Sequence, residues 1–415
     1  MKNIIIIIFS GLFFFLSGKV RAVEPVDSVM GEYARKAGYL MTETNQIKLL
    51  TNGTEKFKEL FAAIRSARHS VHLEYFNFRN DSIGNALFDL LAQKAAEGVE
   101  VRALYDGFGN MSNNRPLRRK KIKEIRSKGV QIYEFDPLRF PWLNHVFSRD
   151  HRKIVVIDGK IGFTGGMNVA DYYINGKAKI GSWHDMHLVI EGPAVELLQN
   201  IFLRIWNKQT GESIGGEQYY PSPDHQWLGV HNPYSKVMVV NREPDRTPGA
   251  IRDTYIAAID AAKDSIRLIN PYFVPTSGVS KALDRALKRG VDVEIMISEK
   301  CDVPFTPDAA RYKLHHLMQK GAKVYYYKGG FHHTKIIMVD GRLCTVGSAN
   351  LNSRSLRFDY EENLFILDKR IATELNEIFE DDKKDSYLLT PEVWKKIAPW
   401  KKFVGWFANL FTFCL

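Results

Sequence analysis

Apolar positions along the chain form two kinds of segment that alternate. Short runs rich in β-branched residues, such as 71–73, 99–105 and 266–269, are typical of buried strands. Between them, segments such as 86–96 and 281–288 carry apolar residues at helical spacing. This alternation of strands and helices predicts an α/β fold with a mostly buried sheet.

The same pattern occurs twice. Residues 63–73 read AIRSARHSVHL and residues 258–268 read AIDAAKDSIRL. Two later pairs, EGVEV with RGVDV and KGVQIYEF with KGAKVYYY, follow at one constant offset. Such a repeat predicts two similar α/β halves, 45–210 and 242–390, which pack about a pseudo-twofold axis. The stretch 211–241 is rich in Gly, Pro and polar residues and is predicted to connect them.

Each half then reaches the same set of polar residues. A His is followed two positions later by a Lys and, after four apolar residues, by an Asp. The apolar run predicts a strand, on which residues two apart face the same side, so His and Lys project together. The candidate catalytic residues are His151, Lys153, Asp158, His333, Lys335 and Asp340.

Downstream, the two halves continue to match. Asn168 and Asn350 lie in turns of small residues that let backbone and amide groups approach an anion closely, with Ser348 as a lesser donor. Asp185 and Glu361 each stand at the start of a further predicted strand. A carboxylate there can accept a hydrogen bond from a histidine ring and fix its tautomer.

The first 22 residues have the features of an export signal. Lys2 supplies a positive charge, residues 4–16 are apolar except for one Ser and one Gly, and Ala22 is a small residue suited to cleavage. The apolar run is shorter than the roughly 20 residues that span a bilayer. We expect a cleaved signal, with an uncleaved short anchor as the alternative.

Length and charge extend this description. A chain of 415 residues exceeds the usual single core, in agreement with two domains. A net charge of +11 favours an anionic partner, but it does not distinguish a membrane from nucleic acid, and some proteins are basic without such a partner. The three cysteines, Cys301, Cys344 and Cys414, are too few for a disulfide framework.

The doubled motif resembles the signature of the phospholipase D superfamily, and the layout is most similar to bacterial cardiolipin synthases. Further similar segments are HLEYFNFRND at 72–81, NPYFVPT at 270–276, WHD at 183–185 and NSRS at 352–355. Cardiolipin synthases usually begin with two hydrophobic spans, whereas this chain has one short apolar run. The resemblance implies a duplicated phospholipase D-type α/β sandwich with the active site between the halves.

The resemblance also implies a two-step reaction without a metal or cofactor. One histidine attacks phosphorus and forms a phosphohistidine, while the other protonates the leaving alcohol and then deprotonates the acceptor. The family assigns His151 as nucleophile and His333 as acid and base, although the near-symmetric sequence alone leaves the reverse assignment open. The implied reaction converts two phosphatidylglycerols to cardiolipin and glycerol.

The C-terminal segment 391–415 interleaves Trp, Phe and Lys at helical spacing. This pattern suits a helix on the surface of an anionic phospholipid membrane, and a terminal helix packed on the core is the alternative. We expect a monomer at the periplasmic face of the inner membrane or in the periplasm. A phospholipase D hydrolase and a secreted nuclease remain alternatives, nucleic acid being the less favoured partner. A non-catalytic binding protein is disfavoured because both motifs are complete.

Overall fold

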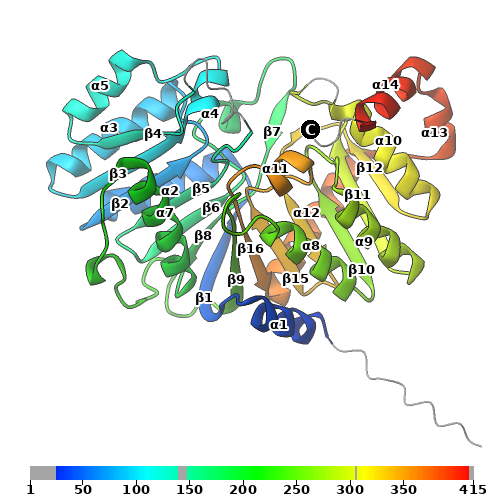
Figure 1. Ribbon diagram of the computed structural model, residues 1–415, viewed down its shortest axis with the longest axis horizontal. Coiled ribbons are helices and arrows are strands. Elements are labelled where there is room, and N and C mark those ends of the chain that lie inside the picture. Colours follow the sequence, from blue (N-terminus) through cyan, green and yellow to red (C-terminus); the bar gives the residue numbers. More distant parts are fainter. Residues whose placement is uncertain (1–24, 139–146, 304–305, 411–415) are drawn as a thin grey trace, which may run out of the picture.

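A single mixed sheet of 15 strands organises the protein. The computed structural model describes residues 25–138, 147–303 and 306–410. Figure 1 shows the two halves side by side, with the first coloured blue to green and the second green through yellow to red. The predicted duplicated α/β sandwich is confirmed.

Counted outward from the centre of the sheet, the strand order is the same in the two halves, except that the second half ends with one further strand, β17. At the centre, β1 (Met41–Leu50) pairs antiparallel with β9 (Ser235–Arg242), so the pseudo-twofold axis passes between these two strands. The first half continues with β8 (His187–Glu191), β6 (Ile161–Gly165), β5 (Lys153–Ile157), β2 (Ser70–Tyr75), β3 (Glu100–Asp106) and β4 (Gln131–Phe135). The second continues with β16 (Glu361–Leu367), β15 (Leu343–Gly347), β14 (Ile336–Val339), β10 (Ser265–Ile269), β11 (Asp292–Ser298), β12 (Lys323–Tyr327) and β17 (Ser386–Leu388).

Helices cover both faces of the sheet. Those of the first half are α2 (Gly53–Ser66), α3 (Ser82–Ala96), α4 (Gly107–Ser112), α5 (Arg119–Ser127), α6 (Tyr172–Asn175) and α7 (Ala194–Thr210). Those of the second are α8 (Ala250–Ala261), α9 (Ser277–Lys288), α10 (Thr306–Gln319), α11 (Ser353–Arg357), α12 (Lys369–Lys384), α13 (Pro391–Lys396) and α14 (Pro399–Leu410). The connection includes a short 3-10 helix, Glu217–Tyr219. Residues of α7 and α12 share one core cluster, so these two helices cover the same face.

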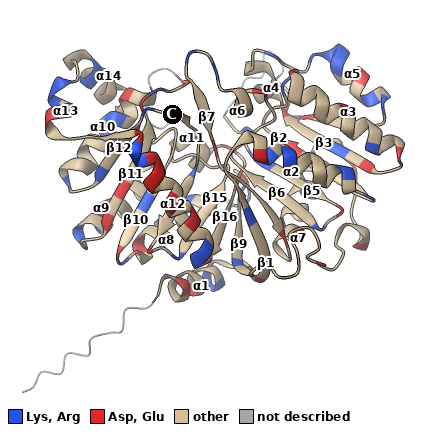
Figure 2. Cartoon of the chain, turned by 180° about the vertical axis from the view of Figure 1, so that it is seen from behind, with Lys and Arg blue, Asp and Glu red and all other residues tan. Residues whose placement is uncertain are grey.

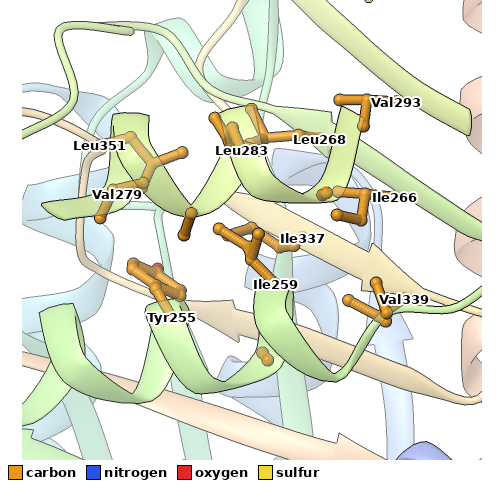
Figure 3. Packing of buried hydrophobic residues seen from close by; sticks show 14 of the residues in the cluster. Tyr255, Ile259, Ile266, Leu268, Val279, Leu283, Val293, Ile337, Val339 and Leu351 are labelled. Carbon is orange, nitrogen blue, oxygen red and sulfur yellow. The ribbon is translucent and has the colours of Figure 1, made fainter. Parts of the chain in front are cut away.

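The opposite face of the second half is packed by α8 and α9. Figure 3 shows Tyr255 and Ile259 of α8 meeting Ile266 and Leu268 of β10, all buried. Burial of one such aliphatic side chain stabilises the fold by about 1.5–3 kcal/mol. The sheet is thereby held firmly enough to position side chains at the ends of its strands.

Two predicted boundaries differ from the structure. Strand β9 begins at Ser235, inside the stretch 211–241 that was predicted to be connection, and β1 begins at Met41, ahead of residue 45. The apolar run of β9 is only four residues long, 237–240, and follows a polar loop, so the sequence pattern understated it. Helix α1 (Val26–Ala37) packs on α8 of the second half.

Several sequence predictions concern residues outside the described ranges. The export signal at 1–22, residues 411–415 and Cys414 are among them. Within the described ranges, Cys301 and Cys344 are free thiols, and no helix combines the length and apolar character needed to cross a bilayer.

Candidate active site

The two histidines stand where the halves meet, just before strands β5 and β14. The backbone N–H of His151 donates to the Tyr360 carbonyl at 2.9 Å, and that of His333 donates to the His184 carbonyl at 2.7 Å. The second contact extends a small parallel sheet formed by β7 (Ser182–His184) and β13 (Gly330–His332). Each histidine is therefore fixed to the backbone of the opposite half.

The predicted carboxylates contact the histidine rings in crossed pairs. Glu361 of the second half accepts from Nδ1 of His151 at 3.1 Å, and Asp185 of the first half accepts from Nδ1 of His333 at 2.6 Å. With Nδ1 carrying the hydrogen toward a carboxylate, Nε2 of each ring is left for chemistry. Both halves are therefore needed to complete each histidine–carboxylate pair.

Charges around His151 favour a neutral ring beside an ionised acid. Burial lowers the pKa of His151 to about 4, and the Lys153 ammonium adds to the shift. Burial alone would raise the pKa of Glu361, but His151, Lys153 and the hydrogen bond from Ser348 outweigh it, and the pKa is about 2. At neutral pH, Nε2 of His151 thus carries a free lone pair, as a nucleophile requires.

The two lysines lie inside the same site. Burial lowers the pKa of Lys335 to about 8, with Asp185 opposing the shift and Lys153 adding to it. The Lys335 Nζ atom is 2.9 Å from Nδ1 of His333, and the Lys153 ammonium donates to the His151 carbonyl oxygen. These fully buried cations form a positive site next to both rings.

The two asparagines are also at the site, but they differ in their hydrogen bonds. Asn168 Nδ2 donates to the Tyr173 hydroxyl at 3.4 Å, whereas Asn350 Oδ1 is buried and has no hydrogen-bond partner among the described residues. Asn350 lines the pocket beside His151. Within the described ranges, no group of three or more His, Cys, Asp or Glu residues is arranged to hold a metal ion.

Ser348 has a different position from the one predicted. Its hydroxyl donates to the Glu361 carboxylate and therefore supports the His151 pair rather than facing a phosphate. The equivalent position in the first half is Gly166, where an added Cβ would lie 2.1 Å from an Asp185 oxygen. The closer approach of Asp185 leaves no room for a side chain there.

Asp158 and Asp340, predicted to be catalytic, lie away from the histidines. Each stands at the far end of its strand, roughly 20 Å from the histidine at about 3.3 Å per residue. Asp158 accepts hydrogen bonds from the backbone N–H groups of residues 68–70 at 2.7 to 2.9 Å. Asp340 does the same for residues 263–265, each at 2.9 Å. The fixed spacing of the motif reflects strand length, and these aspartates have a structural role.

Aromatic residues that the sequence did not single out surround the histidines. The Phe76 ring lies 5.1 Å from the His151 ring, and the rings of Trp183 and Tyr272 lie 5.5 and 5.8 Å from that of His333. A pocket of about 420 Å³ opens beside His151, and Phe108 and Val274 also line it. Phe76 and Tyr272 lie in the similar segments 72–81 and 270–276, and Trp183 lies in the segment 183–185, but the sequence analysis assigned no role to these rings.

Comparisons with known proteins agree with this geometry. A family model described as "Cardiolipin synthase, PLD-like domain" matches residues 60–206 and 255–383. A cardiolipin synthase of Listeria monocytogenes serotype 4a (strain HCC23) is 36% identical over 370 residues, covering 88% of this chain and 74% of the relative. The probable cardiolipin synthase YwiE of Bacillus subtilis (strain 168) is 36% identical over 383 residues, covering 92% and 74%.

The fold has a solved counterpart in a crystal structure of phosphatidylserine synthase from Haemophilus influenzae Rd KW20. The TM-score is 0.69 at 15% identity, over 93% of this chain and 100% of that one, which shows a shared fold alone. Family match, sequence identity and paired motifs lead to one assignment. The chain belongs to the cardiolipin synthase family of phospholipase D-like enzymes.

Proposed function

We propose that this phosphodiester transferase moves a phosphatidyl group from one phosphatidylglycerol to another, releasing glycerol and forming cardiolipin. The observation that carries the proposal is the pair of histidines, each held by a carboxylate of the other half. One ring can attack phosphorus while the other handles the proton of the alcohol. The names of the relatives supply the lipid class.

In the first step, Nε2 of His151 attacks phosphorus and the bond to the glycerol headgroup breaks. His333 transfers a proton from Nε2 to the departing glycerol oxygen, and Asp185 stabilises its protonated form. Burial lowers the pKa of His333, but Asp185 opposes this and the anionic substrate would oppose it further. The products of this step are free glycerol and a phosphatidyl group on His151.

In the second step, the headgroup hydroxyl of another phosphatidylglycerol attacks the phosphohistidine. Neutral His333 accepts the hydroxyl proton, the bond between phosphorus and His151 breaks, and cardiolipin leaves. In both steps negative charge grows on the non-bridging oxygens. Lys153, Lys335, Asn168 and Asn350 would stabilise that charge as fixed donors.

The C-terminal helix is proposed to bind the membrane that holds the substrate. Helix α14 packs on α10 through Gly405, yet exposes Trp400 (61%), Phe403 (60%), Trp406 (44%) and Phe407 (49%). Lys401 and Lys402 lie among these rings, as suits an anionic lipid surface. Thr306, the first residue of α10, also lines the active-site pocket. Figure 2 shows further Lys and Arg on α5, along the same edge of the molecule.

We also propose that the chain is exported and acts at the periplasmic face of the inner membrane or in the periplasm. The support is the charged, then apolar, then small-residue pattern of residues 1–22. The N-terminal sequence of the mature protein in a periplasmic or membrane fraction tests this. A start near residue 23 is expected, whereas an intact N-terminus in the cytoplasm would contradict export.

Mass spectrometry of lipids, after incubation of the protein with phosphatidylglycerol vesicles, tests the reaction. Cardiolipin and glycerol are expected with the intact chain and with His316→Ala, an exposed histidine, but not with His151→Ala. Phosphatidic acid in place of cardiolipin would show a hydrolase. No lipid product at all would refute a lipid substrate and make nucleic acid cleavage the next assay.

A further inference from the structure

A second hollow, of about 590 Å³, lies in the first half, at a position equivalent to the part of the active-site pocket that second-half residues line. Matching backbone contacts establish the equivalence. The Arg79 N–H donates to the Val169 carbonyl at 3.0 Å, and the Val274 N–H donates to the Leu351 carbonyl at 2.9 Å. Arg79 therefore stands where Val274 lines the active-site pocket. We call this hollow the Arg79 pocket.

The two pockets differ in chemistry. The active-site pocket is lined by Tyr272 and Val274, whereas the equivalent positions in the Arg79 pocket are Asn77 and Arg79. Lys177 and Arg115 also line the Arg79 pocket. At these two positions the active-site pocket offers an aromatic and an aliphatic side chain, whereas the Arg79 pocket offers an amide and a cation, which suit an anion that carries hydroxyl groups.

Two buried polar atoms in the Arg79 pocket lack partners. Asn77 is 8% exposed and Arg79 is 9% exposed. Neither Asn77 Oδ1 nor Arg79 Nε has a hydrogen-bond partner among the described residues. Arg79 is held by Asn114, which accepts from its Nη2, and by the Tyr172 ring, 5.1 Å away. Since buried polar groups are normally satisfied, a ligand with both acceptors and donors fits these atoms.

The pocket also contains two carboxylates, but backbone groups occupy them. Asp81 accepts from Gly84 N at 3.1 Å, and Asp171 accepts from Ile83 N at 2.7 Å. They close the turn that begins α3, although Asp81 also lies 3.8 Å from Arg79 Nε. Three cationic side chains against two occupied carboxylates leave the pocket positive.

The Arg79 pocket borders the side of the site that holds the proposed acid and base. The Lys177 Nζ atom lies 4.1 Å from the centre of the Trp183 ring, which is 5.5 Å from the His333 ring. The backbone N–H of Asn77 contacts Asn168 Oδ1 at 3.4 Å. The Trp183 ring thus connects Lys177 to His333, and a ligand anion beside Lys177 would be separated from His333 by this ring.

We propose that the Arg79 pocket binds the phosphodiester headgroup of the acceptor lipid and directs its glycerol hydroxyl toward His333. This inference rests on the proposed transfer reaction and deepens it. Transfer between two lipids needs two headgroup sites, and the duplication supplies two equivalent pockets. The pocket beside His151 then serves the donor, and the Arg79 pocket serves the acceptor.

Kinetics with two distinguishable lipids test the proposal. A trace of donor phosphatidylglycerol of one acyl composition is mixed in vesicles with increasing amounts of acceptor phosphatidylglycerol of another. In Lys177→Met and Arg79→Met the KM for the acceptor should rise about tenfold or more, because a charged contact is lost. Phosphatidic acid formation, in which water is the acceptor, should be retained. Arg118→Met, an exposed cation nearby, should match the wild type.

The outcomes distinguish a failure of the proposed acceptor pocket from a failure of the proposed reaction. Unchanged kinetics in Lys177→Met, or equal loss of cardiolipin and phosphatidic acid, would overturn the acceptor site and leave the proposed function intact. If the wild type makes no cardiolipin, the proposed function fails. Calorimetric titration of His151→Ala protein with glycerophosphoglycerol then decides about the pocket. If the double variant with His151→Ala and Lys177→Met binds one glycerophosphoglycerol fewer than His151→Ala alone, the Arg79 pocket is a binding site for the phosphodiester. Unchanged binding by the double variant would overturn this site.

Discussion

Glu361 and Glu362 are neighbours on β16 and both are fully buried, yet one is ionised at neutral pH and the other is not. The pKa of Glu361 is about 2 because His151, Lys153 and Ser348 outweigh the effect of burial. Burial raises the pKa of Glu362 to about 8, and Glu361 adds to the shift, while the Thr164 hydroxyl donates to the Glu362 carboxyl group and opposes it. At neutral pH, one side chain is therefore an anion that orients His151, and the other is a neutral acid.

This contrast predicts different effects of the same substitution. Glu361→Gln should lower the rate of cardiolipin formation by about 100-fold or more, because it removes the anion that fixes the His151 tautomer. Glu362→Gln is the matched control and should retain most of the rate, since an amide resembles the neutral acid. Initial rates on phosphatidylglycerol vesicles measure both. Equal losses in the two variants would contradict the assignment of the orienting role to Glu361.

Glu362 also predicts a pH dependence of stability. Its folded pKa lies above the ordinary value of 4.5, so its favourable contribution is complete below pH 4.5 and is lost as the pH rises toward 8. Glu362→Gln should therefore gain stability relative to the wild type between pH 4.5 and 8, with no gain at pH 4. Thermal unfolding across this range checks the sign. A constant difference at all pH values would exclude the raised pKa.

At the scale of single residues, the sequence predicted the histidines and the carboxylates but not which carboxylate contacts which histidine. Both halves contain an equivalent carboxylate, so spacing alone does not say whether Asp185 serves His151 or His333. The answer depends on how the halves pack, through contacts such as that of His333 with His184. Ser348 was assigned to phosphate for a similar reason: its contact with Glu361 spans two strands and has no local signal.

At the scale of single elements, the aspartate of each motif closes a strand. Asp158 has a φ of 52°, a left-handed conformation, and accepts three backbone N–H groups. Asp158→Ala should lower the free energy of unfolding by about 2–4 kcal/mol, through lost hydrogen bonds and backbone strain. Asp158→Asn should cost less, because asparagine tolerates this conformation and keeps one acceptor. Denaturant unfolding gives the stabilities, and rates per folded molecule should stay unchanged.

Helix α14 is the element whose role the sequence left between two alternatives. The structure shows the helix packed on α10, but the aromatic side remains exposed, so packing and membrane contact are compatible. Strand β9 shows the opposite case, in which a short apolar run after a polar loop was predicted to be connection. Local periodicity identifies long helices well, whereas short strands are established by their partners, here β1 and β16.

Membrane contact by α14 can be tested with a double substitution. Phe403→Ser with Phe407→Ser should weaken binding to phosphatidylglycerol vesicles about tenfold or more, because two rings no longer enter the lipid. Leu40→Ser is the matched control, an exposed apolar residue between α1 and β1. Vesicle sedimentation measures binding. Equal binding by the double variant and the control would show that α14 does not contact the membrane.

At the scale of the whole molecule, the duplication makes each half depend on the other. Figure 1 shows β1, β9 and β16 joining the halves into one sheet, which fixes the distance between the two histidines. Because the carboxylates are crossed, a change in the first half at Asp185 acts on the second motif, and a change in the second half at Glu361 acts on the first. Substitutions at Glu361 and at Asp185 should therefore impair different steps of the proposed reaction.

A phosphatidyl ester of p-nitrophenol makes this separation measurable, because its leaving group departs without a proton. Glu361→Gln should abolish the burst of p-nitrophenol, since His151 no longer attacks. Asp185→Asn should retain the burst but turn over slowly, since His333 no longer deprotonates the acceptor efficiently, and the phosphatidyl group should accumulate on His151. Rapid-quench kinetics and mass mapping of the trapped protein measure both. A burst lost in Asp185→Asn and kept in Glu361→Gln would reverse the roles of the two histidines, with phosphate then found on His333.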